Sequence, residues 1–459
     1  MVKERARILV VGGGYVGMYT ALRLQRRLKQ ELGRGEAEIT VVTPDPYMTY
    51  QPFLPEAAAG SISPRHVVVP LRRVLPHCRV VVGEVTAVDH AKRTATFTTL
   101  ATEEEGAGPQ QLTYDEIVLA PGSVSRTLPI PGLADYAIGF KTVEEAIGLR
   151  NHVIEQMDIA SSTRDPAIRD AALTFVFVGG GYAGVEALGE LEDMARYTTR
   201  YYHNVQPDDM KWILVEASDR ILPEVGADLG RYTVSELRRR NIDVRLNTRL
   251  DSCADRVAVL SDGARFPTRT VVWTAGVKPH PLLAATDLPL SERGRLKCTP
   301  QLTVDGVTHA WAAGDTAAVP DVTVDEPGRE TAPNAQHAVR QAKVLADNIV
   351  RSLRGEPLQT YAHKYVGSVA SLGLHKGVAH VYGRKLKGYP AWFMHRAYHL
   401  SRVPTVNRKM RVLAEWTLSG LFKREIVSLG SLEHPRAEFE LAAGGKPSGE
   451  SSGDPNGSS

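Results

Sequence analysis

Residues 12–17 read Gly-Gly-Gly-Tyr-Val-Gly, and the stretches on either side of them decide the fold. Residues 7–11 form a short apolar run that is typical of a buried strand. Residues 18–32 carry apolar side chains at helical spacing, with basic side chains on the opposite face. A second strand-like run follows at 38–43, so the segment predicts a βαβ unit with a glycine-rich first turn.

Each glycine of this fingerprint has a physical role. Gly12 permits the tight turn, Gly14 lets the backbone approach a diphosphate, and Gly17 lets the helix pack closely on the strand. The diphosphate then lies at the start of the helix, where free N–H groups and the helix dipole favour an anion. A single fingerprint is a weak signal, because ordinary glycine turns also match it.

The whole unit returns later in the chain. Residues 179–184 read Gly-Gly-Gly-Tyr-Ala-Gly, after a strand-like run at 173–178 and before a helical pattern at 185–197. Another strand-like run follows at 212–216. Two fingerprints, each after a strand and before a helix, argue against chance matches and predict two dinucleotide sites. The three glycines of the second fingerprint are Gly179, Gly181 and Gly184.

The residue that ends the second strand distinguishes the two sites. Glu216 holds this position in the second unit, where a carboxylate accepts from a ribose 2′-hydroxyl and repels a 2′-phosphate. This favours NADH over NADPH, although Arg220 lies nearby and moderates the preference. In the first unit the equivalent position is Thr43, and Asp45 follows two residues later. Either Thr43 makes a weaker ribose contact or Asp45 replaces the acid; Asp45 is explained equally well as a turn residue between two prolines.

The composition is that of an ordinary globular protein of two or three domains: 459 residues, 43% hydrophobic and 23% charged. A formal net charge of +3 makes no case for nucleic-acid binding. Cys78, Cys253 and Cys298 form no CxxC pair, which disfavours a disulfide framework, a zinc site and dithiol chemistry. We expect no metal site and no signal peptide, and no stretch approaches the roughly 20 apolar residues of a membrane-spanning helix.

A third motif, Gly314-Asp315, follows a strand-like run at 308–313. An aspartate there can accept hydrogen bonds from the ribityl chain of a flavin, near its pyrophosphate. Alone, the pair could equally be a turn or a helix cap. Strand-rich stretches also end at Ala120-Pro121-Gly122 and at Thr274-Ala275-Gly276.

Taken together, these motifs resemble the FAD/NAD(P)-binding pyridine-nucleotide oxidoreductases and, within them, the type II NADH dehydrogenases. The closer resemblance rests on five short strings in the expected order, within a match that spans roughly residues 5 to 430. The strings are Tyr50-Gln51-Pro52-Phe53-Leu54-Pro55, Gly184-Val185-Glu186, Trp273-Thr274-Ala275-Gly276-Val277, Ala313-Gly314-Asp315 and Ala335-Gln336-His337-Ala338.

The resemblance implies that FAD binds the first unit and NADH the second. Hydride would pass to the flavin, and electrons to a quinone, menaquinone or ubiquinone, on its opposite face. It also implies that Glu186 lies beside nicotinamide and flavin and handles protons. The alternative for Glu186 is an acid of the first helical turn that complements the helix dipole. Besides the glycines of the two fingerprints, the expected cofactor contacts are Thr43, Ala120, Gly122, Glu216, Gly276, Gly314 and Asp315.

The quinone motif of this family is usually Ala-Gln-x-Ala-x-Gln. Here Gln336 matches the first glutamine, but Gln341 comes one residue late, which turns it by about 100° around a helix. Gln336 is therefore a candidate catalytic residue beside Glu186, and Gln341 is a doubtful one. His337 and Lys343 could be simple surface groups.

Residues 391–424 combine aromatic and basic side chains. A first helix carries His395, Arg396, His399 and Arg402, and a second carries Val406, Met410, Leu413, Trp416 and Leu421 on one side, with Lys423 and Arg424 at its end. Such a pattern suits a helix lying on an anionic membrane surface. A helix that packs on its own domain, or on a partner subunit, explains it equally well. The resemblance favours the cytoplasmic face of the cell membrane, with a homodimer as the assembly.

The predicted fold is therefore α/β, with two Rossmann-type domains, the NADH domain inserted into the FAD domain, and a C-terminal membrane-facing region. The expected reaction is NADH:quinone oxidoreduction without proton pumping. The alternatives are a soluble NADH-dependent reductase with another acceptor and a flavin-bound NADH sensor with slow turnover. We expect the FAD domain at 5–135 and 292–350, the NADH domain at 136–291, the C-terminal region at 351–435 and a disordered tail at 441–459.

Overall fold

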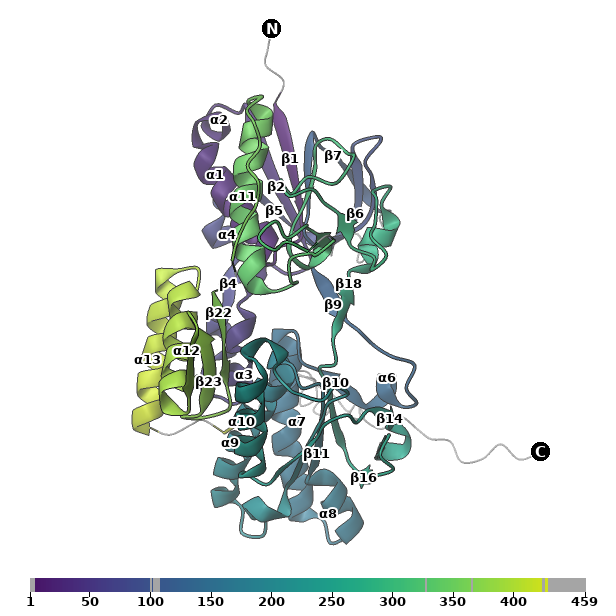
Figure 1. Ribbon diagram of the computed structural model, residues 1–459, viewed down its shortest axis with the longest axis vertical. Coiled ribbons are helices and arrows are strands. Elements are labelled where there is room, and N and C mark those ends of the chain that lie inside the picture. The colour runs from purple at the N-terminus through teal and green to yellow at the C-terminus, as the bar shows by residue number, and fades with distance from the viewer. Residues whose placement is uncertain are drawn as a thin grey trace, which may run out of the picture.

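The computed structural model describes residues 5–99, 101, 108–326, 328–364, 366–422 and 426–427. These residues form two lobes, each built around a parallel sheet, and a smaller C-terminal layer beside them (Figure 1). The tail at 441–459, Lys423 and Arg424 lie outside the described residues.

The first lobe contains a seven-stranded sheet in the order β20-β8-β1-β2-β5-β6-β7. The strands from β20 to β5 pair in parallel, and β6 and β7 extend β5 as an antiparallel meander. Helices α1 and α11 pack against each other beside β1 (Figure 1). The bounds are β1 Ala6–Val11, α1 Tyr15–Arg27, β2 Ala37–Thr43, β5 Arg79–Asp89, β6 Thr94–Thr99, β7 Gln110–Thr113, β8 Glu116–Leu119, β20 Ala310–Ala312 and α11 Ala335–Leu353.

The second lobe contains a five-stranded parallel sheet in the order β10-β17-β11-β12-β13. Its central strands are apolar along nearly their whole length, as expected for a sheet that is covered on both faces. The bounds are β10 Ala137–Gly139, α7 Val143–Ser162, α8 Pro166–Ala172, β11 Thr174–Val178, α9 Tyr182–Thr198, β12 Lys211–Val215, α10 Ala227–Arg238, β13 Ile242–Arg245, β14 Leu250–Ser252, β15 Val257–Leu260, β16 Arg265–Pro267 and β17 Thr270–Trp273.

The chain crosses between the lobes twice, through β9 (Ser123–Ser125) and β18 (Val277–Pro279), which pair antiparallel (Figure 1). Strand β20 then pairs with β8, so residues that follow the second lobe complete the sheet of the first. The expected insertion of one Rossmann-type unit into the other is therefore observed.

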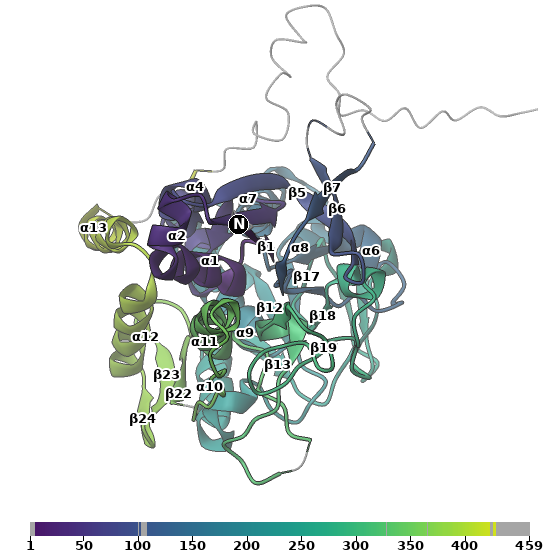
Figure 2. The ribbon, with the colours of Figure 1, turned by 90° about the horizontal axis from the view of Figure 1, so that it is seen from above.

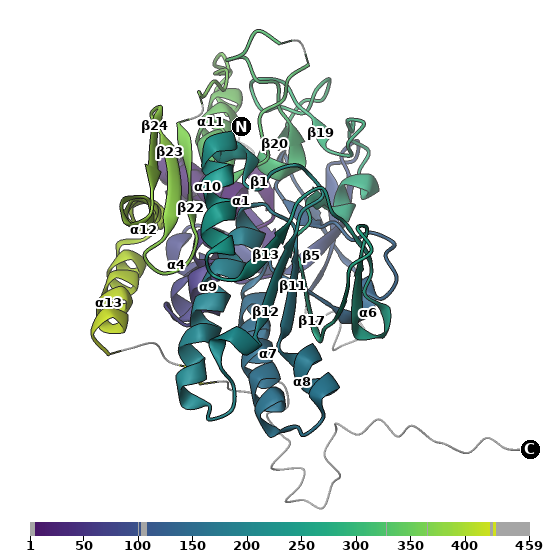
Figure 3. The same cartoon turned by 60° about the horizontal axis from the view of Figure 1, so that its bottom comes forward.

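The C-terminal layer consists of three antiparallel strands and two helices. In Figures 2 and 3, α12 and α13 lie at the outer edge of the molecule, with the strands between them and α10. Shorter elements that matter below are α3 (Leu54–Ala58) and the 3-10 turns η1 (Gln51–Phe53) and η8 (Gly314–Thr316). The bounds of the layer are β22 Gly367–Ser371, β23 Gly377–Val381, β24 Arg384–Lys387, α12 Tyr389–Arg402 and α13 Val406–Phe422.

Two details of the expected amphipathic helices are wrong. Trp416 does not share the outer face of α13, because its ring packs edge-on against Phe53 and its Nε1 donates to Glu56 at 2.6 Å. Arg396 is not a basic surface group of α12, because its guanidinium pairs with Glu56 and lies over the rings of Trp392 and Trp416. Both side chains fasten the two helices to α3.

Candidate functional site

The first glycine turn closes against the carboxyl end of β8. Gly12 has φ +99°, and a side chain there would overlap the carbonyl oxygen of Ala120. A side chain at Gly17 would overlap the carbonyl oxygen of Gly12. Gly14, by contrast, is exposed, and a Cβ there would meet nothing within 4 Å. The turn is thus tight on the inside and open on the side where a diphosphate would approach.

The second turn repeats this construction. Gly179 has φ +116°, and a Cβ there would lie 2.7 Å from Thr274 Oγ1. A side chain at Gly184 would overlap the carbonyl oxygen of Gly179, while Gly181 faces open space. Thr274 Oγ1 also donates to Val178 O at 2.9 Å, so it closes the turn from β17. In the sequence, Thr274 appears only within the string at 273–277, which assigns it no role of its own.

Both turns lead directly into helices, and the exposed glycine of each turn is the N-cap, Gly14 for α1 and Gly181 for α9. Helices α1 and α9 have neither a side-chain cap nor an acidic residue in the first turn. An exposed glycine next to uncapped N–H groups is the arrangement that holds a diphosphate. The described residues therefore fit two dinucleotides, one on each lobe.

Glu216 lies directly beneath the second turn. Its Oε2 accepts from Gly180 N at 2.6 Å, and its Oε1 accepts from Ser218 N at 2.8 Å. In the first unit, Thr43 takes the same place, since a Cβ on Gly13 would lie 2.7 Å from Thr43 Oγ1. Asp45 is exposed two residues further on. The geometry thus gives Thr43, and not Asp45, as the positional counterpart of Glu216.

The Gly314-Asp315 motif packs against the first turn of α1, directly after the first glycine turn. Gly314 has φ +67°, and a Cβ there would lie 2.8 Å from Val16 Cγ2. Asp315 Oδ2 accepts from Ser123 Oγ at 2.7 Å, and Gly122 N donates to Thr316 Oγ1 at 3.1 Å. The ends of β8 and β20 and the first turn therefore meet at one edge of the sheet, as the motif order predicted.

Lys141 is a charged group at this edge that sequence reasoning missed. Its Nζ donates to Ser123 Oγ at 2.9 Å and to the Ser123 carbonyl oxygen. Burial lowers the pKa of Lys141, while the nearby Asp315 and Glu145 act in the opposite direction. A lone lysine after a short strand carries no motif, so only the folded chain reveals it.

Gln336 and Gln341 have different surroundings on α11. Gln336 is half-buried; its Nε2 donates to Gly367 O at 3.2 Å, and its Oε1 lies 3.1 Å from His363 Nε2. Gln341 is buried, and its Oε1 accepts from Gly314 N at 2.8 Å, so it supports the Gly314 turn. His337 is not a surface group, because it is buried against Tyr361, with its Nδ1 2.8 Å from the hydroxyl.

Glu186 is buried on α9, one turn beyond the second glycine turn. Its Oε1 accepts from Ser371 N at 2.9 Å and lies 3.1 Å from His395 Nε2. As the fifth residue of α9, it stands beyond the first turn, which weakens the helix-dipole explanation. Strand β22 links the two candidate catalytic residues, since Gln336 contacts Gly367 at one end and Glu186 contacts Ser371 at the other, about 13 Å along the strand.

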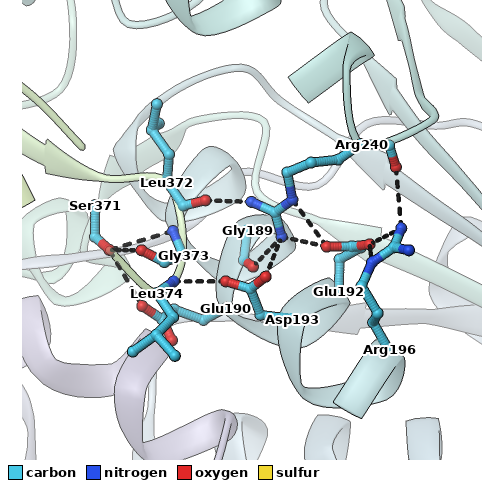
Figure 4. A network of polar contacts seen from close by, with 10 residues as sticks. All are labelled: Gly189, Glu190, Glu192, Asp193, Arg196, Arg240, Ser371, Leu372, Gly373 and Leu374. Carbon is cyan, nitrogen blue, oxygen red and sulfur yellow. Dashed lines mark hydrogen bonds and ion pairs between the residues drawn. The ribbon is translucent and has the colours of Figure 1, made fainter. Parts of the chain in front are cut away.

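A charged network holds α9 against the loop after β22 (Figure 4). Arg240 pairs with Glu192 and Asp193, and its guanidinium also donates to the carbonyl oxygens of Gly189 and Leu372. Ser371 Oγ donates to Glu190 at 3.1 Å, so Glu190 helps to hold the end of β22 against α9. The loop that follows the Ser371–Glu186 contact is therefore anchored to α9 at several points.

This architecture is shared with a known protein family. The model of the pyridine nucleotide-disulphide oxidoreductase family matches residues 5–342. The type II NADH:quinone oxidoreductases of Staphylococcus epidermidis and Staphylococcus aureus are each 31% identical to this chain over 400 residues, 86% of this chain and 94% of theirs. The chain belongs to this family, among the type II NADH:quinone oxidoreductases.

The structural comparison confirms the fold of this type II family member. NDH2 from Plasmodium falciparum, solved in complex with NADH, superposes with a TM-score of 0.83 at 16% identity, covering 92% of this chain and 100% of that one. In the described part of the chain, no helix is long and apolar enough to cross a membrane. The same residues contain no cluster of three or more His, Cys, Asp or Glu side chains suited to a metal ion.

Proposed function

We propose that this protein is an FAD-dependent NADH:quinone oxidoreductase. The observation that carries the proposal is the pair of open glycine turns, one with a carboxylate beneath it, in a chain 31% identical to type II enzymes over 86% of its length. FAD, when bound, takes two electrons from NADH and passes them to the quinone. The protein binds and orients the partners and manages the protons.

The first lobe would hold FAD. Gly12, Gly14 and Gly17 form its diphosphate turn, Thr43 faces the ribose, and Asp315 accepts from the ribityl chain. Ala120, Gly122 and Gly314 line the same sheet edge, so their backbone can approach the cofactor closely. We assign this role to residues 5–135 and 292–350.

The second lobe, residues 136–291, would hold NADH. Gly179, Gly181 and Gly184 form the diphosphate turn, Glu216 binds the ribose, and Gly276 (φ +91°) leaves the backbone open beyond β17. Glu186, buried on the helix that this turn opens, would hold or release a proton beside the reacting rings. Gln336 would orient the quinone from α11.

An anaerobic experiment tests the reaction. The flavin spectrum of the purified protein is bleached with NADH, and a soluble menaquinone or ubiquinone analogue is then added. Rapid return of the oxidised spectrum supports the proposal. Bleaching without reoxidation by quinone would contradict it and favour another acceptor or a slow NADH sensor.

Glu216 should set the preference for NADH over NADPH. A hydrogen bond to a charged group contributes about 1.5–3 kcal/mol, so Glu216→Gln should lower the ratio of kcat/KM for NADH to that for NADPH by about 10- to 100-fold. Asp219→Asn, an exposed neighbouring acid, is the matched control and should leave the ratio unchanged. Equal kcat/KM values for both nucleotides in the natural protein would remove the ribose argument.

The outer face of α13 would attach the protein to the cytoplasmic face of the membrane, as part of a C-terminal region at 351–435. Arg411 lies exposed on the same helix, and an apolar face with basic neighbours suits an anionic interface. The exposed apolar side chains are Val406, Met410, Leu413, Leu418, Leu421 and Phe422.

Two carboxylates on this face should release the protein from vesicles. Burying a Met or Leu side chain is worth about 1.5–3 kcal/mol, so Met410→Glu with Leu421→Glu should weaken sedimentation with anionic vesicles by at least about hundredfold. Ile168→Glu with Tyr201→Glu makes the same charge change on exposed apolar sites of the second lobe and is the control. Equal binding by both double variants would refute this attachment. We also propose that the protein is a homodimer. Light scattering in detergent measures the molar mass of the assembly and tests this.

A further inference from the structure

A row of titratable side chains leads away from Glu186, and the two cofactor turns do not account for it. The first step joins Glu186 on α9 to His395 on α12, with 3.1 Å between Oε1 and Nε2. The two side chains are 8% and 2% exposed. A carboxylate and an imidazole that are withdrawn from water together cost free energy unless each remains well partnered. Yet neither ring nitrogen of His395 makes a well-aligned hydrogen bond among the residues that the structure describes, so Nε2 meets Glu186 as a close ion-pair contact and Nδ1 has no partner.

The second step joins His395 to His399. The two histidines are four positions apart on α12, which places both rings on one face of the helix. The ring centroids lie 4.5 Å apart, with the planes tilted by 64°. His399 Nδ1 lies 3.2 Å from the hydroxyl of Tyr50, just before η1. His395 is buried but His399 is partly exposed, so the row runs from an enclosed carboxylate toward the surface.

The surroundings keep the outer end of the row uncharged. Burial, together with the neighbouring His395, lowers the pKa of His399 well below its usual value. Burial also raises the pKa of Tyr50 well above its usual value, so its hydroxyl remains protonated. A neutral imidazole has one N–H and one bare nitrogen, so it can accept a proton on one side and release one on the other.

The other charged and titratable groups near the row come from three elements. Glu190 of α9 accepts a hydrogen bond from Ser371. Arg396 of α12 forms an ion pair with Glu56. Tyr15 and Tyr19 of α1, with Tyr398 and Arg402 of α12, surround Tyr50. Among these groups, His395 contacts Glu186 and His399 contacts Tyr50, so the two histidines connect the buried carboxylate to the partly exposed end of the row.

We propose that His395 and His399 form a proton path between solvent and Glu186 that serves quinone reduction. This rests on the proposed function. The overall reaction, NADH + H⁺ + quinone → NAD⁺ + quinol, transfers two electrons and two hydrogens to the quinone. One hydrogen originates in NADH, and the other is a proton from solution. The path delivers that second proton, and each histidine is restored by taking up the next one from its outer neighbour.

When the two half-reactions are measured separately, they distinguish a proton-transfer role of His395 from a purely structural one. Bleaching of the flavin spectrum by NADH moves a hydride and consumes no proton from solution, whereas quinone reduction does. In stopped-flow experiments on His395→Gln holoenzyme, we expect bleaching at the natural rate and quinone reoxidation slowed about hundredfold, the scale of lost proton transfer. Added imidazole should restore part of the quinone rate in His395→Ala. His203→Gln, an exposed histidine of the second lobe, should behave as the natural protein.

Two further readouts follow the protons and the histidine rings directly. A pH-indicator dye should show proton uptake that is delayed together with quinone reduction in His395→Gln. In spectra of ¹⁵N-histidine-labelled protein, Glu186→Gln should move the ring nitrogen resonances of His395 and leave those of His203 in place. Unmoved His395 resonances would show that the two side chains are not paired.

The outcomes of these experiments distinguish failure of the proton path from failure of the proposed quinone reduction. If the natural protein is bleached by NADH but does not reduce quinone, the proposed function fails. If it reduces quinone and His395→Gln does so at the same rate, or both half-reactions slow equally, the proton path is overturned. Should His395→Gln lose FAD, the partly exposed His399→Gln decides: about tenfold slower quinone reduction supports the path, and an unchanged rate at full flavin content refutes it.

Discussion

Gly17→Ala should yield a protein that contains almost no FAD. The added methyl group would overlap the carbonyl oxygen of Gly12 and would also lie 3.4 Å from Val10 Cγ1, both on or beside β1. Because backbone cannot swing aside like a side chain, α1 must move away from the strand. This opens the diphosphate turn and costs about 1–3 kcal/mol of folding free energy. The absorbance ratio of flavin to protein, with the melting temperature, measures both effects.

Gly33→Ala is the matched control for that substitution. Gly33 ends a short helix of the same lobe, and a Cβ there would meet nothing within 4 Å. The variant should retain FAD and be as stable as the natural protein, or slightly more stable, since alanine restricts the unfolded chain. A Gly17→Ala protein with full flavin content would show that the first turn is not the FAD diphosphate site.

Arg240→Ala should destabilise the second lobe strongly. The Arg240 side chain is 9% exposed, and Glu192, its principal partner, is fully buried. Removal of one member of a buried ion pair leaves the other charge uncompensated, which costs about 3–5 kcal/mol. The loop after β22 also loses a backbone anchor at Leu372, and α9 loses one at Gly189. Urea unfolding monitored by fluorescence measures the loss, and hydrogen exchange should rise first in that loop.

Two further variants test the cause of this loss. Arg231→Ala removes an exposed arginine that pairs with Asp228 on α10, and should cost no more than about 1 kcal/mol. Arg240→Met combined with Glu192→Met removes both charges and should recover most of the stability, because apolar side chains of similar size can replace a buried pair. A double variant no more stable than Arg240→Ala would locate the loss in the backbone anchors instead.

Several features of the site were predictable because they depend on neighbours along the chain. Gly12, Gly17, Gly179 and Gly184 are needed where a strand turns into a helix, and each turn is complete within six residues. Glu216 was predictable for a similar reason, since a residue that ends the adjacent parallel strand must lie beside the turn. The same logic failed to choose between Thr43 and Asp45, which the register of β2 against β1 resolved.

The errors concern side chains whose partners lie far along the chain. Arg396 and Trp416 are residue types that are common in interfacial helices. Here both side chains donate hydrogen bonds to Glu56, which lies 340 residues from Arg396 and 360 residues from Trp416 in the sequence, and they therefore point toward the protein. His337 carries no local sign of burial, because the rings that pack against it, Tyr361 and His363, come from a later segment of the chain. Helical periodicity shows which residues share a face, but not what covers that face.

The chain thus specifies its two nucleotide turns and its βαβ units through short-range patterns, because glycine sterics and strand register act within a few residues. The surroundings of Glu186 have a different origin. Ser371 reaches it across 185 positions, and His395 meets it only after α12 has packed beside β22. Burial, and the ionisation that follows from it, depend on every element that excludes water from a group, so they arise only when distant segments pack together.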